Sequence, residues 1–133
     1  MREHISNLDA IKNICTQARI YFIEDCAHSL GAKWNGNLVG HHGEIACFST
    51  QSYKALNSGE GGLIDTNNVQ FAVYYILAAS YYERLYKKHF VVLIMIIYLK
   101  NLKHHIPNFS LRISNLTAAV LRPQIEFLEN KIS

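Results

Sequence analysis

The sequence lacks a long hydrophobic run, a cysteine pattern and an excess of one charge, and each absence excludes a class of protein. The longest uncharged apolar run, residues 90–99, has ten residues, whereas a membrane-spanning helix needs about 20. The N-terminus shows no secretory signal. Three cysteines without a C-x-x-C pair indicate neither a disulfide framework nor a zinc ribbon. We therefore expect a cytoplasmic protein with no membrane partner.

Charged residues are few and of mixed sign. The 13 Lys and Arg face 10 Asp and Glu, and the net charge of +3 is scattered along the chain, so we expect no nucleic-acid partner. The histidine pairs at 41–42 and 104–105 lack the i, i+4 spacing of helical zinc motifs, so we expect no metal. Half of the 133 residues are hydrophobic, which is enough for the packed core of one domain.

Hydrophobic periodicity predicts an alternation of helices and short strands. The predicted helices cover residues 5–19, with Ser6 or Asp9 as N-cap, then one or two helices within 69–99, and finally 115–131, kinked at Pro123. The predicted strands are residues 20–23, 44–49 and 62–66, with a hairpin of Lys33-Trp34 and Leu38-Val39 around Asn35-Gly36. The run at 20–23 is apolar on both faces, as in parallel sheets. This order predicts a layered α/β domain.

Four polar side chains lie where the predicted strands end or in the segments just beyond them: Asp25, His28, Ser49 and Lys54. In open α/β sheets, ligands bind beyond the carboxyl ends of the strands, so these side chains are expected to line one crevice. An amine, a carboxylate and a hydroxyl together suit pyridoxal phosphate. Its aldehyde needs a lysine, its ring nitrogen a carboxylate, and its phosphate hydroxyl and backbone N–H donors.

The segment IEDCAHSLGAKWNGNLVGHHGEIACFSTQSYKALNSGEGG, residues 23–62, resembles the cofactor-binding core of the DegT/DnrJ/StrS sugar aminotransferases. The family pattern is E-D-x-A-[QH]-x-x-G, then G-x-x-G-x-x-G-[DE], F-S, a lysine five residues beyond that serine, and G-E-G-G. The matching residues are Glu24, Asp25, Ala27, His28, Gly31, Gly36, Gly40, Gly43, Glu44, Phe48, Ser49, Lys54, Gly59, Glu60, Gly61 and Gly62. A weaker match to R-M-S-x-x-x-A-A-x-x-x-x-Q comprises Arg112, Ser114, Ala118, Ala119 and Gln124.

The resemblance implies a function and a role for each of the four side chains. Lys54 would form the Schiff base with pyridoxal phosphate and act as the catalytic base, Asp25 would bond the pyridinium nitrogen, His28 would contact the ring, and Ser49 would bind the phosphate. Members of this family transfer an amino group, usually from glutamate, to a nucleotide-linked keto sugar for polysaccharide or secondary-metabolite synthesis, and they form homodimers. Relatives that are dehydratases carry His at the lysine position, so Lys54 favours aminotransfer.

The resemblance also implies that parts of the usual enzyme are missing. The chain would be a partial large domain of the fold type I pyridoxal-phosphate transferase fold, without the N-terminal half and the C-terminal small domain. We expect a single partial domain over 1–133, with cofactor-binding strands and loops in 1–66 and a mainly helical part in 67–133. The apolar stretch 90–103 matches nothing in the family pattern. The alternative reading is a non-catalytic truncated remnant of such an enzyme.

Overall fold

A computed structural model describes residues 4–80, 102 and 105–132 of the chain. The chain divides into two compact units, one made of Met1–Asp65 and Ile113–Ser133 and the other of Thr66–Arg112. The first unit holds the predicted site residues and every strand found among the described residues. Each unit has its own small hydrophobic core.

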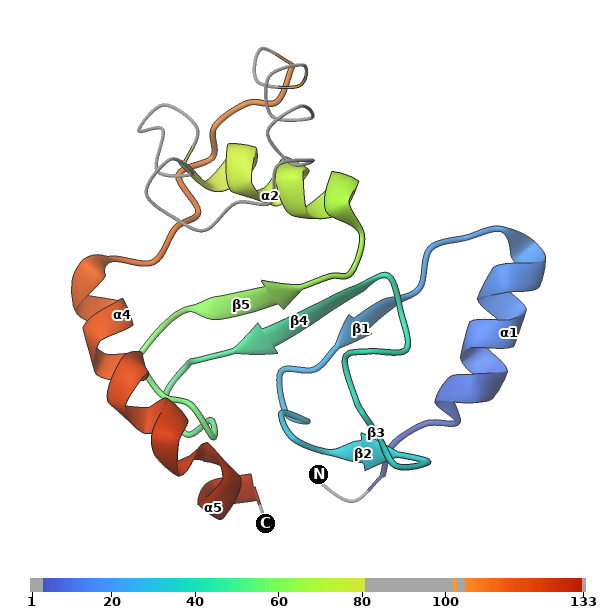
Figure 1. Ribbon diagram of the computed structural model, residues 1–133, viewed down its shortest axis with the longest axis horizontal. Coiled ribbons are helices and arrows are strands. Elements are labelled where there is room, and N and C mark those ends of the chain that lie inside the picture. Colours follow the sequence, from blue (N-terminus) through green and yellow to red (C-terminus); the bar gives the residue numbers. More distant parts are fainter. Residues whose placement is uncertain (1–3, 81–101, 103–104, 133) are drawn as a thin grey trace. The chain divides into compact units, whose positions relative to one another are not determined.

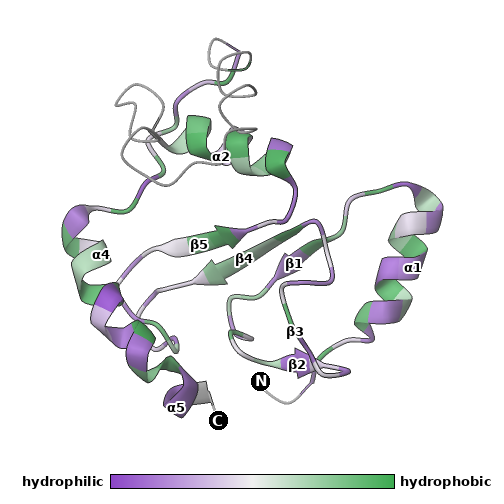
Figure 2. Ribbon diagram, in the orientation of Figure 1, coloured by the Kyte–Doolittle hydropathy of each residue, from purple (hydrophilic) through white to green (hydrophobic). Residues whose placement is uncertain are grey.

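Helix α1 spans Leu8–Ala18, a shorter range than the predicted 5–19. Its N-cap is Asn7, whose side-chain oxygen accepts a hydrogen bond from Ala10 N at 3.0 Å, so the prediction of Ser6 or Asp9 is wrong. Asp9 lies inside the first turn, and its Oδ2 instead accepts bonds from Trp34 Nε1 at 2.8 Å and Asn35 Nδ2 at 2.7 Å. Figure 2 shows the alternating polar and apolar surface of this helix.

The central sheet has three strands in the order β1-β4-β5: β1 Ile23–Asp25, β4 Ile45–Ser49 and β5 Gly62–Asp65 (Figure 1). Strands β1 and β4 are parallel, whereas β5 returns antiparallel to β4, so the parallel-sheet expectation holds for one pair. The reason lies in the connection, because residues 50–61 fold back as a hairpin loop closed by Thr50 N donating to Gly61 O at 2.9 Å.

Strand β1 begins later than predicted and is covered on one face. Its ladder pairs Ile23, Glu24 and Asp25 with residues 45–47, so 20–22 remain outside it. Glu24 is buried, but Ile23 is 58% exposed, so the expectation of burial on both faces is wrong for this strand. The face of the sheet that carries Glu24 also carries its partner Ala46, which belongs to the core of this unit. That core consists of buried Leu8, Cys26, Val39 and Ala46, with partly buried Ile5, Phe22, Ala32, Trp34 and Phe48 around them.

The predicted hairpin is present as β2 Lys33–Trp34 and β3 Asn37–Leu38, which pair antiparallel. Its second strand begins one residue earlier than the predicted Leu38-Val39. Asn35 and Gly36 connect them with φ of 48° and 82°, the left-handed conformation that a two-residue hairpin turn requires. The bonds from Trp34 and Asn35 to Asp9 fasten this hairpin to α1.

The C-terminal segment is helical, but it is not the single kinked helix that the sequence predicts. Helix α4 spans Asn115–Leu121, a 3-10 helix η3 spans Arg122–Phe127, and α5 spans Leu128–Ile132. Ser114 caps α4 by accepting a bond from Thr117 N at 3.0 Å. Pro123 has no N–H and crowds the preceding turn, which explains why the tighter 3-10 conformation begins beside it.

The second unit contains helix α2, Val69–Ser80, whose surface is apolar almost all round (Figure 2). Its buried side chains Val73, Leu77 and Ala78 pack with Ile106. The rest of the predicted helical stretch up to 99, and all of 90–103 except Leu102, lies outside the described residues. No helix in the described ranges is both long enough and apolar enough to cross a membrane.

Candidate functional site

The loop of residues 50–61 presents Lys54 at the carboxyl end of β4. Its base is closed like a short ladder, with Ser52 N donating to Gly59 O at 2.9 Å and Ser58 N to Thr50 O at 2.8 Å. Thr50 is 1% exposed and anchors the loop. At the tip, Lys54 N donates to Gln51 O at 3.2 Å. The loop is therefore a defined hairpin with its lysine near the turn.

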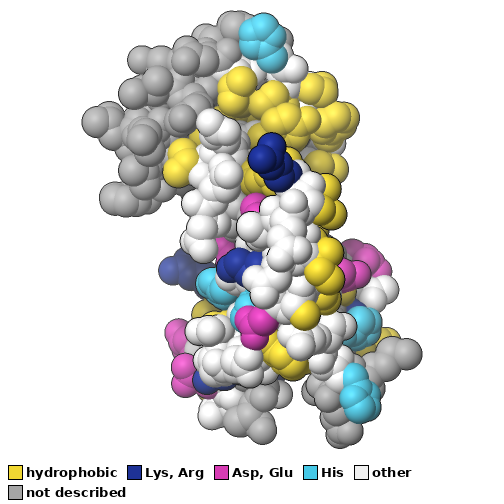
Figure 3. Space-filling view, turned by 90° about the vertical axis from the view of Figure 1, so that its right-hand side faces the viewer, with side chains coloured by type: hydrophobic (Ala, Val, Ile, Leu, Met, Phe, Trp, Pro, Cys, Tyr) yellow, Lys and Arg dark blue, Asp and Glu magenta, His cyan; other side chains and the backbone are white. Residues whose placement is uncertain are grey.

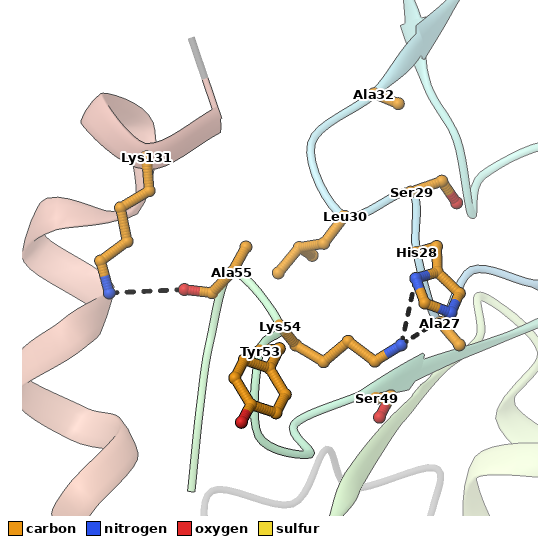
Figure 4. A pocket seen from close by; sticks show the side chains of 10 residues that line it. All are labelled: Ala27, His28, Ser29, Leu30, Ala32, Ser49, Tyr53, Lys54, Ala55 and Lys131. Carbon is orange, nitrogen blue, oxygen red and sulfur yellow. Dashed lines mark hydrogen bonds between the residues drawn. The ribbon is translucent and has the colours of Figure 1, made fainter. Parts of the chain in front are cut away.

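The side chains of Lys54 and His28 meet, although 26 residues separate them in the sequence. Lys54 Nζ lies 2.9 Å from His28 Nε2 and 3.2 Å from His28 Nδ1 (Figure 4). His28 is held in a tight turn after β1, in which Ala27 N donates to Asp25 Oδ1 at 3.1 Å and Ser29 N to Cys26 O at 3.1 Å. An amine and an imidazole in contact form a pair that can exchange a proton.

Lys54 and His28 line a pocket of about 260 Å³ together with Ser49. The other residues of its wall are Ala27, Ser29, Leu30, Ala32, Tyr53, Ala55 and Lys131. Ser49 is the last residue of β4, and its Oγ accepts a bond from Gln51 N at 3.2 Å, which leaves the hydroxyl hydrogen to be donated to a ligand. Figure 4 shows Lys54 running along this pocket toward His28.

Asp25 does not line that pocket. It lines an adjoining one of about 350 Å³, and both pockets share His28 and Ser29. Asp25 pairs with Cys47 in the β1–β4 ladder, so Asp25, Cys47 and Ser49 point to the same face of the sheet. Among the hydrogen bonds of residues 4–80 and 105–132, Asp25 accepts only the one from Ala27 N, so its other oxygen is available.

Glu24, the neighbour of Asp25, supports the site from the opposite face of the sheet. It is 4% exposed, and its carboxylate accepts bonds from Gly40 N at 2.8 Å, His42 N at 2.8 Å and Gly43 N at 2.6 Å. The sequence marks Glu24 and the glycines as parts of one pattern, but it does not show that they are bonded to each other. Only the structure shows the hydrogen bonds from these backbone N–H groups to Glu24.

Two further residues have contacts at the site that the sequence did not indicate. Gln124 pairs with the backbone of Asn57, in the loop that carries Lys54. Lys131 lines the pocket, with its Nζ 3.4 Å from Ala55 O. Gln124 belongs to the weaker motif, whereas Lys131 belongs to no pattern.

Cys26 follows Asp25 directly in the sequence and is buried. Burial raises the pKa of the Cys26 thiol from 9.0 to about 11; a hydrogen bond with Ser29 opposes this shift, while the charges of Glu24 and Asp25 contribute to it. No three His, Cys, Asp or Glu side chains of the described segments gather in a way that would hold a metal ion. On the face shown in Figure 3, described charged side chains and histidines occur in small mixed groups.

A family model for the DegT/DnrJ/EryC1/StrS aminotransferases matches residues 2–133. The chain belongs to this family. The resemblance seen in its motifs is thereby confirmed. The fold agrees: the crystal structure of 3-amino-5-hydroxybenzoic acid synthase has a TM-score of 0.74 at 26% identity, covering 95% of this chain and 30% of that one. An aminotransferase of the family from Brucella abortus has a TM-score of 0.71 at 21% identity, covering 95% and 30%.

Two of the curated relatives of this DegT-family chain are named as synthases. GDP-perosamine synthase of Escherichia coli O157:H7 is 28% identical over 130 residues, which is 98% of this chain and 32% of the relative. The 3-amino-5-hydroxybenzoate synthase of Amycolatopsis mediterranei is 26% identical over 132 residues, which is 97% and 31%. The chain thus spans about a third of the length of these relatives.

Proposed function

We propose that this chain carries the lysine-bearing part of the site of a pyridoxal-phosphate-dependent aminotransferase. The observation that carries the proposal is the contact of Lys54 Nζ with the His28 ring, in a pocket that Ser49 also lines. These are the side chains whose types and spacing match the family motif. A surface lysine without a function is not expected to line a pocket and to contact an imidazole ring, whereas Lys54 does both.

The residues present fit the cofactor by their chemistry. Lys54 offers a primary amine, Ser49 a hydroxyl donor at the end of a strand, and Asp25 a carboxylate with one oxygen free of bonds from the described residues. Pyridoxal phosphate, when bound, supplies an aldehyde and a ring that takes up electrons. In our proposal Lys54 bonds the aldehyde, Asp25 holds the proton on the ring nitrogen, His28 contacts the ring and Ser49 donates to the phosphate.

During amino transfer, Lys54 acts as the base. In this proposal Lys54 Nζ would take up and return the proton of amino transfer, and the contact with His28 would keep the amine oriented for this task. The substrate in this proposal is a nucleotide-linked keto sugar, and the amino donor is glutamate. The name of the relative GDP-perosamine synthase supports the sugar class. We also propose that whole enzymes of this kind are homodimers and that they are cytoplasmic.

For the fold, we propose that the described sheet belongs to the large domain of the fold type I transferases, as a single partial domain over 1–133. Residues 1–66 supply the cofactor-binding strands and loops, and 67–133 are mainly helical. Coverage of about 30% of the solved relatives at TM-scores of 0.71 and 0.74 supports a partial domain.

A non-catalytic remnant of such an enzyme is the second candidate function. The observation that favours it is the separation of Asp25 and Lys54 into adjoining pockets.

The test is optical and chemical. The purified chain is mixed with pyridoxal phosphate, its visible absorbance is recorded, and the adduct is reduced with borohydride and located by mass spectrometry. We expect a visible band and label on Lys54, both lost in Lys54→Met. Lys12→Met, at an exposed position of α1, is the matched control and should keep both. Label spread over surface lysines, with no band that depends on Lys54, would favour the remnant.

A further inference from the structure

The side-chain amide of Gln124 is paired with the loop that carries Lys54, at Asn57, although these two residues are 67 positions apart in sequence. Gln124 Nε2 donates to Asn57 O at 2.6 Å, and Asn57 N donates to Gln124 Oε1 at 3.1 Å. The amide of Gln124 thus bonds both backbone groups of one residue, as a neighbouring β-strand residue would. Asn57 follows Lys54 by three positions.

Gln124 is itself held in one orientation. Its Nε2 also donates to Val120 O at 2.8 Å, so both amide hydrogens are used and Oε1 must face Asn57 N. Gln124 lies in η3, where bonds run between residues three apart, so a carbonyl four residues back is open to a side-chain donor. Lys131 Nζ also donates to Gln124 Oε1 at 3.5 Å. The change of helix type at Pro123 therefore supports the pairing.

The tip of the Lys54 loop depends on bonds from other parts of the chain. The loop's own ladder joins residues 50 and 52 to 58, 59 and 61, below the tip. Among the described residues, side-chain hydrogen bonds join the tip to distant segments at three places: Lys54 with His28, Asn57 with Gln124, and Ala55 with Lys131. Of these, the pairing with Gln124 contributes two bonds to a single backbone unit.

We infer that Gln124 is a positioning residue for Lys54. Its amide clamps the loop tip in the conformation in which Lys54 Nζ meets the His28 ring, and removal of the clamp separates these two groups. The relevance of the clamp to amino transfer rests on the proposed function, whereas its effect on the Lys54–His28 contact is a property of the chain without cofactor.

The experiment records the ring signals of His28 by carbon–proton NMR in the full chain without cofactor. Lys54→Met gives the reference position of these signals when the amine contact is absent. Gln124→Met keeps the length of the side chain but removes both bonds to Asn57. Gln124→Glu keeps an acceptor for Asn57 N and loses the donor to Asn57 O. Gln17→Met, at an exposed position of α1, is the matched control.

We expect Gln124→Met to move the His28 signals at least half of the way to their Lys54→Met position, Gln124→Glu to move them less, and Gln17→Met to leave them unchanged. Amide hydrogen exchange in residues 53–57 should rise about tenfold in Gln124→Met, since two hydrogen bonds are lost. If exchange rises but His28 does not move, Gln124 only stabilises the loop and the inference is wrong.

Folding of each variant is checked by its circular dichroism, and Gln124→Glu carries the test if Gln124→Met does not fold. An unchanged His28 signal and unchanged exchange in a folded variant would also overturn the inference. Because no cofactor is present, these outcomes are independent of whether pyridoxal phosphate attaches to Lys54. Failure of the clamp and failure of the proposed function are therefore distinguishable.

Discussion

The buried carboxylate of Glu24 accepts a hydrogen bond from Gly43 N at 2.6 Å, across 19 residues of sequence. The N–H groups of Gly40 and His42 point to the same carboxylate, both at 2.8 Å. A charge that is only 4% exposed is costly unless it is well bonded, and here three backbone donors satisfy it. The loop at 40–43 is thereby fixed to β1 beside Asp25.

Glu24→Gln should lower the free energy of unfolding by about 2–4 kcal/mol, because it loses charge-assisted bonds and turns an NH₂ group toward backbone N–H donors. Urea unfolding followed by fluorescence measures this, since Trp34 is the only tryptophan of the chain and lies in the same unit. Glu126→Gln, at an exposed position of η3, is the control and should change little. Equal midpoints for the two variants would contradict the role of Glu24.

Gly43→Ala should destabilise the chain more than Gly59→Ala. A Cβ on Gly43 would collide with the backbone carbonyl oxygen of Phe22, which cannot rotate away, and the expected cost is about 1–3 kcal/mol or more. A Cβ on Gly59 meets nothing within 4 Å, and only its φ of 84° opposes alanine, at about 1 kcal/mol. Urea midpoints of the two variants give the comparison, and the reverse order would show that the packing around Gly43 is loose.

Ser49→Ala tests the phosphate side of the proposed cofactor site. Loss of one hydrogen bond to a charged group should weaken the binding of pyridoxal phosphate about tenfold. Pyridoxal, which has the aldehyde but no phosphate, should bind the variant and the parent chain equally. Titration of the visible band with each compound measures both affinities. A parallel loss of affinity for pyridoxal would mean that Ser49 supports the pocket and does not bind phosphate.

Cys26 should make stability fall in alkali. Burial raises the pKa of its thiol from 9.0 to about 11, so between these values the unfolded chain loses the proton while the folded chain retains it. The unfolded state then binds fewer protons, and the free energy of unfolding falls as pH rises from 9 to 11. The difference between the parent chain and Cys26→Ala, measured by urea unfolding from pH 8 to 11, isolates this effect. A constant difference across that range would refute it.

Local patterns of the sequence predicted much of the first unit. The Asn35-Gly36 turn allowed the hairpin to be placed, because a type I′ turn needs residues that tolerate positive φ, and both have it. The predicted strand at 44–49 is β4 with its first residue removed. The motif of residues 23–62 was sufficient to identify the family, since it depends on residue types and spacing and not on their contacts.

By itself, then, the sequence determined the family, the order of the elements and the four candidate site residues. The tertiary structure alone decided where β1 begins, the antiparallel direction of β5, the division of Asp25 and Lys54 between two adjoining pockets, and the pairing of Gln124 with Asn57. The physical reason is the range of the forces involved. Backbone preference and hydrophobic periodicity act over a few residues, whereas a strand boundary or an amide pairing depends on which distant backbone groups fold to within hydrogen-bond distance.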